Sequence, residues 1–301
     1  MSGILELDVS EFKANNNSPI LSAGIAIAHI ASGLVAGALG YLAFTYNIVL
    51  GAVLYLPLVF FIGTRWRAIN NMCHECFHFH FVRKKSWNER YGIIFAILEF
   101  GSYYEFREDH ATHHRHLGDF DKDQDFRGFE EFDFPASITL QRVLKQLLFA
   151  MSLRHISVYI SAKMYVRRDP PWARWVRTIY ILALLTLAVL YPLLFVAYVL
   201  VPFITSYQII KYLTDYLDHG GLLNNTAPLH QSRNCLINNP LLRWIAFPRH
   251  DNYHLVHHLF PAIPNSRMHE AHQWLCAHWP EYANLEHNLY KKMLKLTSPH
   301  V

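Results

Sequence analysis

Residues 14–64 read ANNNSPILSAGIAIAHIASGLVAGALGYLAFTYNIVLGAVLYLPLVFFIGT and contain no Asp, Glu, Lys or Arg. As one helix this stretch would be about 76 Å long, more than twice the roughly 30 Å of a bilayer's hydrocarbon core. It therefore predicts a hairpin of two membrane-spanning helices at about residues 19–42 and 47–65. The turn is expected near Tyr46 and Asn47.

A second uncharged stretch covers residues 178–210. It is too long for one perpendicular helix and just long enough for two. We expect a second hairpin with spans at about residues 177–196 and 198–217, a break between Tyr191 and Pro202, and a last helix that projects beyond the bilayer. A soluble protein would have to bury both stretches, although neither is amphipathic. The predicted fold is an all-α, polytopic membrane protein with four spanning helices.

The composition of the 301 residues excludes other classes of protein. Hydrophobic residues make up 52% of the chain and charged residues 17%, against roughly 25% charged in an average soluble domain. A net charge of +4 without a basic stripe argues against nucleic-acid binding. Four scattered cysteines do not form a disulfide framework, and Cys73 and Cys76 are expected to be small residues on a helix.

The basic residues predict the orientation. All but one of the 27 Lys and Arg lie in segments 65–177 and 211–301, and neither predicted hairpin turn contains one. By the positive-inside rule, residues of about 66–176 and 218–301 are expected in the cytosol together with both termini. They would form a helical cap on a single membrane-bound domain covering residues 1–301.

The 20 histidines are numerous for a chain with 23 Asp and Glu, and they are clustered. Three clusters stand out: His74–His78 (HECFH), His110–His114 (HATHH) and His254–His258 (HLVHH). On a helix, spacings of three and four residues place side chains on one face, so each cluster can present two or three imidazoles to a common point. Neutral imidazole suits iron, zinc, copper and nickel. All three clusters lie at the predicted cytosolic ends of spans, which indicates a metal site.

The triple pattern HxxxH, HxxHH and HxxHH, with the segment NYHLVHHLFPAIP at 252–264, resembles the integral-membrane fatty acid desaturase superfamily. The resemblance extends from the first hairpin to about Pro264. It implies a non-haem di-iron centre at the cytosolic membrane face. Such a centre activates O₂ with two externally supplied electrons and removes hydrogen from an unactivated C–H bond of a lipid.

The resemblance also implies roles for individual residues. Eight cluster histidines match the family's iron ligands: His74, His78, His110, His113, His114, His254, His257 and His258. A ninth ligand is expected from the cytosolic end of the last span, where His219 stands. Asp215, on the same helical face, is expected either to bind iron directly or to orient a histidine. Asp218 is less favoured, because adjacent residues do not face each other on a helix.

Residues near the clusters have alternative interpretations. Glu75 is expected to be an outer partner of the site or a solvated acid. The acidic run Asp119–Asp133 is expected to close over the iron site or to be a solvated loop. His29 lies inside the first span and is expected to face a helix neighbour, and the mixed stretch Val143–Val166 is expected to form a helix in the membrane interface. Three histidines beside the clusters are alternative ligands: His80, His116 and His250. The remaining histidines are expected at the surface or interface: His155, His230, His269, His272, His278, His287 and His300.

The activity implied by the resemblance is O₂-dependent desaturation of a fatty acyl chain that is linked to a lipid, CoA or a carrier protein. The acyl chain of the substrate would enter a tunnel lined by residues of 91–104 and 203–217. A lipid or carotenoid hydroxylase or ketolase could use the same iron site. No His-Pro-Gly-Gly motif of a fused cytochrome b5 occurs, so a separate ferredoxin or cytochrome b5 is the expected electron donor. A metal transporter should carry ligands within its spans, where only His29 lies.

Overall fold

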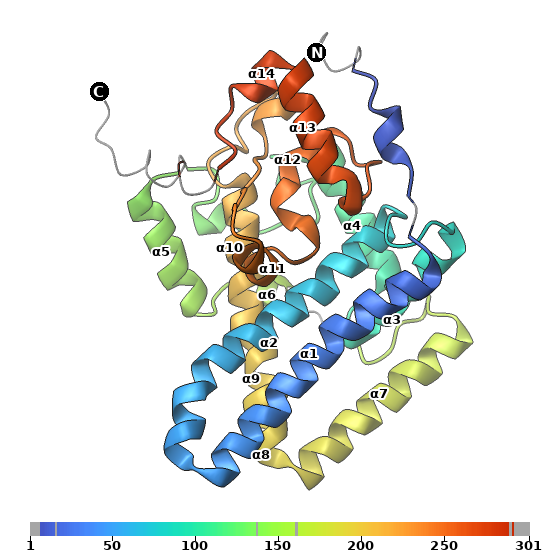
Figure 1. Cartoon of the computed structure of the whole chain (residues 1–301), viewed down its shortest axis with the longest axis vertical. Coiled ribbons are helices and arrows are strands. Elements are labelled where there is room, and N and C mark those ends of the chain that lie inside the picture. The colour runs from blue at the N-terminus through green and yellow to red at the C-terminus, as the bar shows by residue number, and fades with distance from the viewer. Residues whose placement is uncertain (1–6, 16, 137, 160–161, 289–290, 292–301) are drawn as a thin grey trace.

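The computed structural model of the chain describes residues 7–15, 17–136, 138–159, 162–288 and 291. Within these ranges the regular elements are all helices, and the only β interaction is an isolated bridge between Leu236 and Asn288. Long helices form one end of the molecule and shorter helices form the other (Figure 1). The predicted all-α class is confirmed. The expected cytosolic position of the chain termini concerns residues 1–6 and 292–301, which lie outside the described ranges, as does His300.

The first hairpin consists of α1 (Pro19–Tyr46) and α2 (Ile48–Phe77), and its turn is at Asn47 as predicted. The Asn47 side chain caps α2, because its Oδ1 accepts hydrogen bonds from the amides of Val49 and Leu50 at 2.9 and 3.0 Å. The two helices run side by side in Figure 1. One polar residue at the turn thus ends one apolar helix and starts the next.

Helix α2 does not end near residue 65, where the predicted span ends. It continues without a break to Phe77 and carries the first histidine cluster. The polar side chains that follow the apolar part, Arg67, Asn70 and Asn71, are buried by other parts of the chain. The charged and amide side chains beyond residue 65 therefore show that the helix continues into a polar protein interior. They do not show that the helix ends there.

The second hairpin turns at Tyr191. Its first helix, α7 (Pro171–Leu190), begins earlier than the predicted 177, because Arg177 is buried in an ion pair with Asp169 at 2.8 Å and can lie within the helix. The second segment of the hairpin consists of four consecutive helical elements: α8 (Pro192–Phe195), a π-helical turn (Val196–Leu200), α9 (Val201–Ile204) and α10 (Ser206–His219). A proline cannot donate its backbone hydrogen bond, so Pro202 accounts for the irregular helix at this point.

In the part of the chain that the structure describes, four helical segments are long and apolar enough to cross a membrane: Pro19–Tyr46, Ile48–Phe77, Pro171–Leu190 and Pro192–His219. Their large apolar side chains point outward, with Ile20 85% and Val189 79% exposed. Such faces would be unfavourable in water and suit a lipid environment. The prediction of four spanning helices in a membrane protein is confirmed.

The shorter helices form a cap at one end of the four long ones (Figure 1). Helix α3 (Lys85–Leu98) returns along α2 and α7. The cap comprises α4 (Tyr103–His116), α5 (Leu140–Met151), α6 (Ile156–Tyr159), α11 (Pro240–Ala246), α12 (His254–Leu259), α13 (Met268–His278) and α14 (Pro280–Ala283). The last part of α10 enters the cap from below in Figure 1. Helices α2 and α10 thus extend from the long helical segments into the cap.

The stretch Val143–Val166 is not one interfacial helix. Helix α5 ends at Met151, Leu153 has a positive φ of 60°, and the short α6 follows. The exposed face of α5 includes Leu144, Leu148 and Met151. The apolar character that prompted the prediction thus belongs to α5.

Candidate metal centre

The nine histidines expected to bind metal come from four parts of the fold and converge in the cap. Helix α2 and the residue after it supply His74 and His78, α4 supplies three histidines, α10 supplies His219 and α12 supplies three more. They fall into two groups whose possible ligand atoms lie within 4.8 Å of one another. The first group is His74, His78, His110, His114 and His257, and the second is His113, His219, His254 and His258.

The spacing HxxHH explains this division. His110 and His114 are four residues apart on α4 and join the same group, whereas His113 between them points to the other group. The third cluster shows the reverse pattern, because His254 and His258 join the second group and His257 joins the first. Each HxxHH helix therefore contributes to both groups and holds them next to each other.

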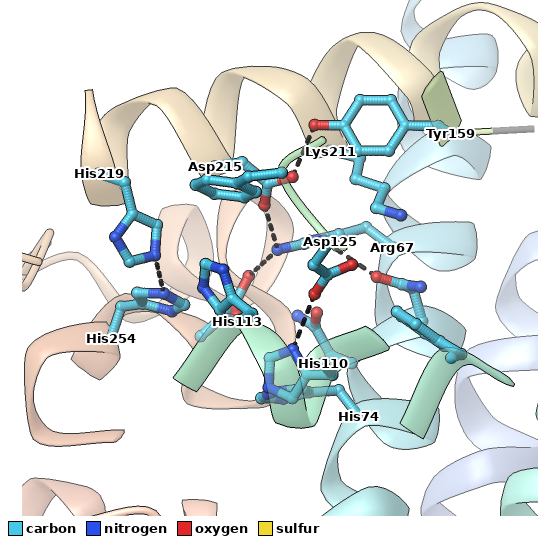
Figure 2. Close-up of a pocket in the computed structure, with 15 residues that line it drawn as sticks. Arg67, His74, His110, His113, Asp125, Tyr159, Lys211, Asp215, His219 and His254 are labelled. Atoms are coloured by element: carbon cyan, nitrogen blue, oxygen red, sulfur yellow. Dashed lines mark hydrogen bonds and ion pairs between the residues drawn. The ribbon is translucent and has the colours of Figure 1, made fainter. Parts of the chain in front are cut away.

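The ring nitrogens within each group face one another. In the first group, Nε2 of His110 lies 2.8 Å from Nε2 of His74 and 3.0 Å from Nε2 of His114. In the second, Nε2 of His254 lies 2.7 Å from Nε2 of His219, an approach visible in Figure 2, and 3.0 Å from Nε2 of His258. Imidazole nitrogens grouped in this way form a donor set that could hold a metal ion.

Burial favours the neutral form of six of these imidazoles. Burial is the main cause of a pKa well below the ordinary histidine value in all six, and neighbouring histidines lower the pKa further. These six are His78, His113, His114, His254, His257 and His258. A neutral imidazole has a free lone pair, which metal binding requires.

Carboxylates and carbonyls fix the other ring nitrogen of several of these histidines. Asp125 and Asp123 each place Oδ2 2.9 Å from Nδ1, of His110 and His113 respectively. Nδ1 of His219 lies 3.0 Å from the carbonyl oxygen of Gln231. Such outer partners fix the ring orientation and direct Nε2 toward a common point. The acidic run after the second cluster thus contacts the histidines, and the solvated-loop alternative is wrong for the fully buried Asp123.

Asp215 belongs to neither histidine group. It lies on α10 one turn before His219, and both side chains face the same pocket in Figure 2. Its Oδ2 accepts a 2.6 Å hydrogen bond from the hydroxyl of Tyr159, and its Oδ1 lies 3.8 Å from Arg67. Asp218, the less favoured acid, is buried with Oδ2 3.6 Å from Nδ1 of His254. Arg67 also forms an ion pair with Asp251 at 2.8 Å. Neither Arg67 nor Asp251 was identified as a residue of the site from the sequence.

The alternative ligands lie outside both groups. His80, His116 and His250 are members of neither. As expected, His29 faces a helix neighbour, with Nδ1 3.0 Å from Arg65. Glu75 is not a solvated acid, because it forms a buried bidentate ion pair with Arg249 at 2.7 and 2.8 Å.

Several of the remaining sequence predictions can be judged as well. Cys73 and Cys76 are free, buried residues of α2, as expected. A surface or interfacial position was expected for His155 and His272, and the surface alternative was wrong. Both are buried, His155 with Nε2 3.1 Å from the carbonyl of Gln208 and His272 with Nδ1 2.7 Å from the hydroxyl of Tyr282.

Comparison with known proteins identifies the family of this chain. Residues 50–290 match the family model described as fatty acid desaturase, which covers all nine histidines. The chain belongs to the fatty acid desaturase family. It is similar to the dihydrorhizobitoxine desaturase of Bradyrhizobium elkanii, with 25% identity over 242 residues, 72% of this chain and 66% of that protein. The family assignment supports an oxidoreductase of the desaturase type.

Proposed function

We propose that this desaturase-family chain removes two hydrogens from neighbouring carbons of an aliphatic substrate, using O₂ and two irons held by nine histidines. The observation that carries the proposal is the convergence of these histidines in two adjacent groups with Nε2 atoms 2.7–3.0 Å apart. One iron would be held by the group of five and the other by the group of four. Imidazole is a common ligand of non-haem iron.

The donor set fits such a cofactor. Nε2 of His78 is buried and has no hydrogen-bond partner among the described residues, a costly state unless a metal binds the nitrogen. The outer contacts of His110, His113 and His219 are all made through Nδ1, which leaves Nε2 free for a metal. The ordered outer contacts thus match what two imidazole-bound irons would require.

The irons, when bound, supply the redox chemistry that activates O₂. The overall reaction balances when the substrate loses two hydrogen atoms, the electron donor supplies two electrons, two protons are taken up and O₂ leaves as two waters. This chain's residues hold the ring orientation through Asp123 and Asp125 and surround the site with protein. We propose a separate ferredoxin or cytochrome b5 as the donor.

The substrate expected from the sequence is a fatty acyl chain, which the bilayer could deliver to the cap. Residues 91–104 and 203–217, predicted to line its tunnel, do contribute to a cavity beside the histidines, through Ala96 and Phe203 among others. We propose that the cap and both termini lie on the cytosolic side, because the basic residues are concentrated there.

Expression in a host followed by lipid and metabolite profiling tests the proposed function. The purified wild-type chain should contain about two irons, and its host should accumulate a product two hydrogens lighter than the substrate. His113→Ala and His257→Ala each remove a ligand from one group and should abolish product and reduce iron, whereas the exposed His230→Ala should change neither. Full activity of either ligand variant would contradict the proposal. A product that gains oxygen would indicate a hydroxylase, and metal movement into proteoliposomes would indicate a transporter.

A further inference from the structure

A second cavity, called the polar chamber here, lies beside the histidines. Its volume is about 380 Å³, within the usual range for small-molecule sites. Five residues line both this chamber and the histidine pocket of Figure 2: Asn70, Phe106, Asp125, Tyr159 and Lys211. A molecule in the polar chamber is therefore next to the histidines.

The wall of the polar chamber is strongly charged. Its ionisable side chains include Glu99, Glu105, Asp109, Asp125, Lys163 and Lys211. An unbranched hydrocarbon chain would gain nothing from these groups and would displace the water around them at a cost. The charged wall does not suit the fatty acyl chain that the family resemblance implies as substrate.

Four of these charged groups already have partners. Glu99 accepts hydrogen bonds from Tyr207 at 2.8 Å and Asn70 at 3.1 Å. Glu105 pairs with Lys163, and Asp125 pairs with a histidine. These groups are part of the protein's own network.

Two groups of opposite charge are left. The Lys211 ammonium lies 4.3 Å from the ring centre of Tyr159 and 5.5 Å from that of Phe106, and has no hydrogen bond or ion pair among the described residues. The half-buried carboxylate of Asp109 on α4 likewise has no such partner in the described part of the chain. The Lys211 charge acts on the carboxylates of Glu99 and Asp125 without touching either, so the wall offers a ligand one cation and one anion that have no hydrogen bond or ion pair among the described residues.

An apolar cavity of about 370 Å³ exists elsewhere, between α1, α2 and α7, and it shares no lining residue with the histidine pocket or the polar chamber. Aromatic side chains lie between it and the chamber, with the Trp66 ring 5.0 Å from Phe203 and the Phe100 ring 5.7 Å from Tyr180. This apolar cavity is therefore separate from the histidines.

We propose that the polar chamber binds a substrate that carries both a carboxylate and an ammonium group, as an amino acid does, with its carbon chain directed toward the histidines. The carboxylate would pair with Lys211 and the ammonium with Asp109. This inference rests on the proposed desaturase function and names its substrate class. The amino-carboxylate group could belong to a free amino-acid derivative or to the serine headgroup of a lipid.

Binding to the iron-loaded chain in detergent tests the inference with a matched series: 2-aminooctanoic acid, octanoic acid and octylamine. Isothermal titration should give the tightest binding for 2-aminooctanoic acid. Lys211→Met should weaken that binding about tenfold or more and leave octylamine unaffected, whereas Asp109→Asn should spare octanoic acid. Lys211→Arg should retain binding, and Lys145→Met, an exposed residue paired with Asp133, should leave all three constants unchanged. Vesicles with phosphatidylserine or phosphatidylcholine distinguish the lipid source from the free one.

The same samples separate the two proposals. After reduction with dithionite and exposure to O₂, a product of 2-aminooctanoic acid two hydrogens lighter supports both. Desaturation of fatty acyl substrates alone, or equal binding of octanoic and 2-aminooctanoic acid with no effect of Lys211→Met, overturns the substrate class and leaves the desaturase function standing. An iron-free, inactive wild-type chain overturns the desaturase function, while the titrations still report on the chamber.

Discussion

Oδ2 of Asp123 lies 2.9 Å from Nδ1 of His113, and both residues are buried. Asp123 also accepts hydrogen bonds through Oδ1 from the amides of Asp125 and Phe126 at 3.1 Å each. Hydrogen bonds within its own loop therefore fix the carboxylate independently of its contact with the histidine. A rigid acceptor at this position orients the imidazole and raises the electron density on Nε2.

Replacement of this carboxylate should weaken metal binding. We expect Asp123→Asn to lower iron affinity about 10–100-fold, the usual effect of removing an outer carboxylate. Competition with a chelator, followed by iron quantification, measures the change. Asp121→Asn, an exposed change in the same loop, is the control. Equal iron retention in the two variants would show that the Asp123 contact does not support the metal.

The ion pair between Glu75 and Arg249 should matter for stability because it is buried. Glu75 is 1% exposed and Arg249 12%, so Glu75→Gln leaves a nearly buried guanidinium without its anion. We expect a loss of about 3–5 kcal/mol, seen as a lower Tm in detergent. The exposed pair of Glu108 and Arg168 is the comparison, and Glu108→Gln should leave the Tm almost unchanged, because solvent screens this pair. Similar Tm shifts for the two variants would contradict this prediction.

Gly63 lies where α2 crosses the start of α10. A Cβ at this position would overlap with Oγ of Ser206, which donates a 2.7 Å hydrogen bond to the carbonyl of Val59. We expect Gly63→Ala to destabilise the chain by about 1–3 kcal/mol through overpacking. Gly24→Ala meets nothing within 4 Å and should be neutral or slightly stabilising. Thermal unfolding of both variants in one detergent decides the point.

His272 should make stability sensitive to acid. Burial lowers its pKa to about 4, with a further contribution from His287, so between pH 4 and 6.5 the unfolded chain binds a proton that the folded chain does not. Stability therefore falls as pH drops below about 6.5, and His272 should contribute a loss of about 2 kcal/mol by pH 5. His272→Gln should reduce the Tm difference between pH 7.5 and 5. An unchanged difference would mean that His272 is accessible to protons in the fold.

Much of the fold could be predicted because a bilayer imposes a simple pattern on a sequence. Charge-free segments longer than one bilayer thickness predicted both hairpins, and Asn47, a polar residue between apolar ones, marked the first turn. The ends of the spans were less predictable. A charged residue such as Arg67 signals water or a protein interior equally well, and only the tertiary structure, which buries it against Asp251, distinguishes the two.

The histidine groups were predictable from spacing, but their partners were not. Helical periodicity brings His110 and His114 together whatever the rest of the chain does. The contact between Asp125 and His110 depends on the path of an irregular loop, for which the sequence offers only an alternation of acids. The polar chamber depends on side chains from α3, α4 and α10, which meet only in the folded chain.

The continuity of α2 has a consequence for how this protein can vary. The helix crosses the membrane and carries His74 without a break, so one residue inserted between Phe61 and His74 would turn the imidazole by about 100° around the helix axis. The same holds between Ser206 and His219 on α10. Insertions and deletions should therefore be confined to exposed loops outside the site, such as residues 224–227, while the lengths of these two helices stay constant to the residue.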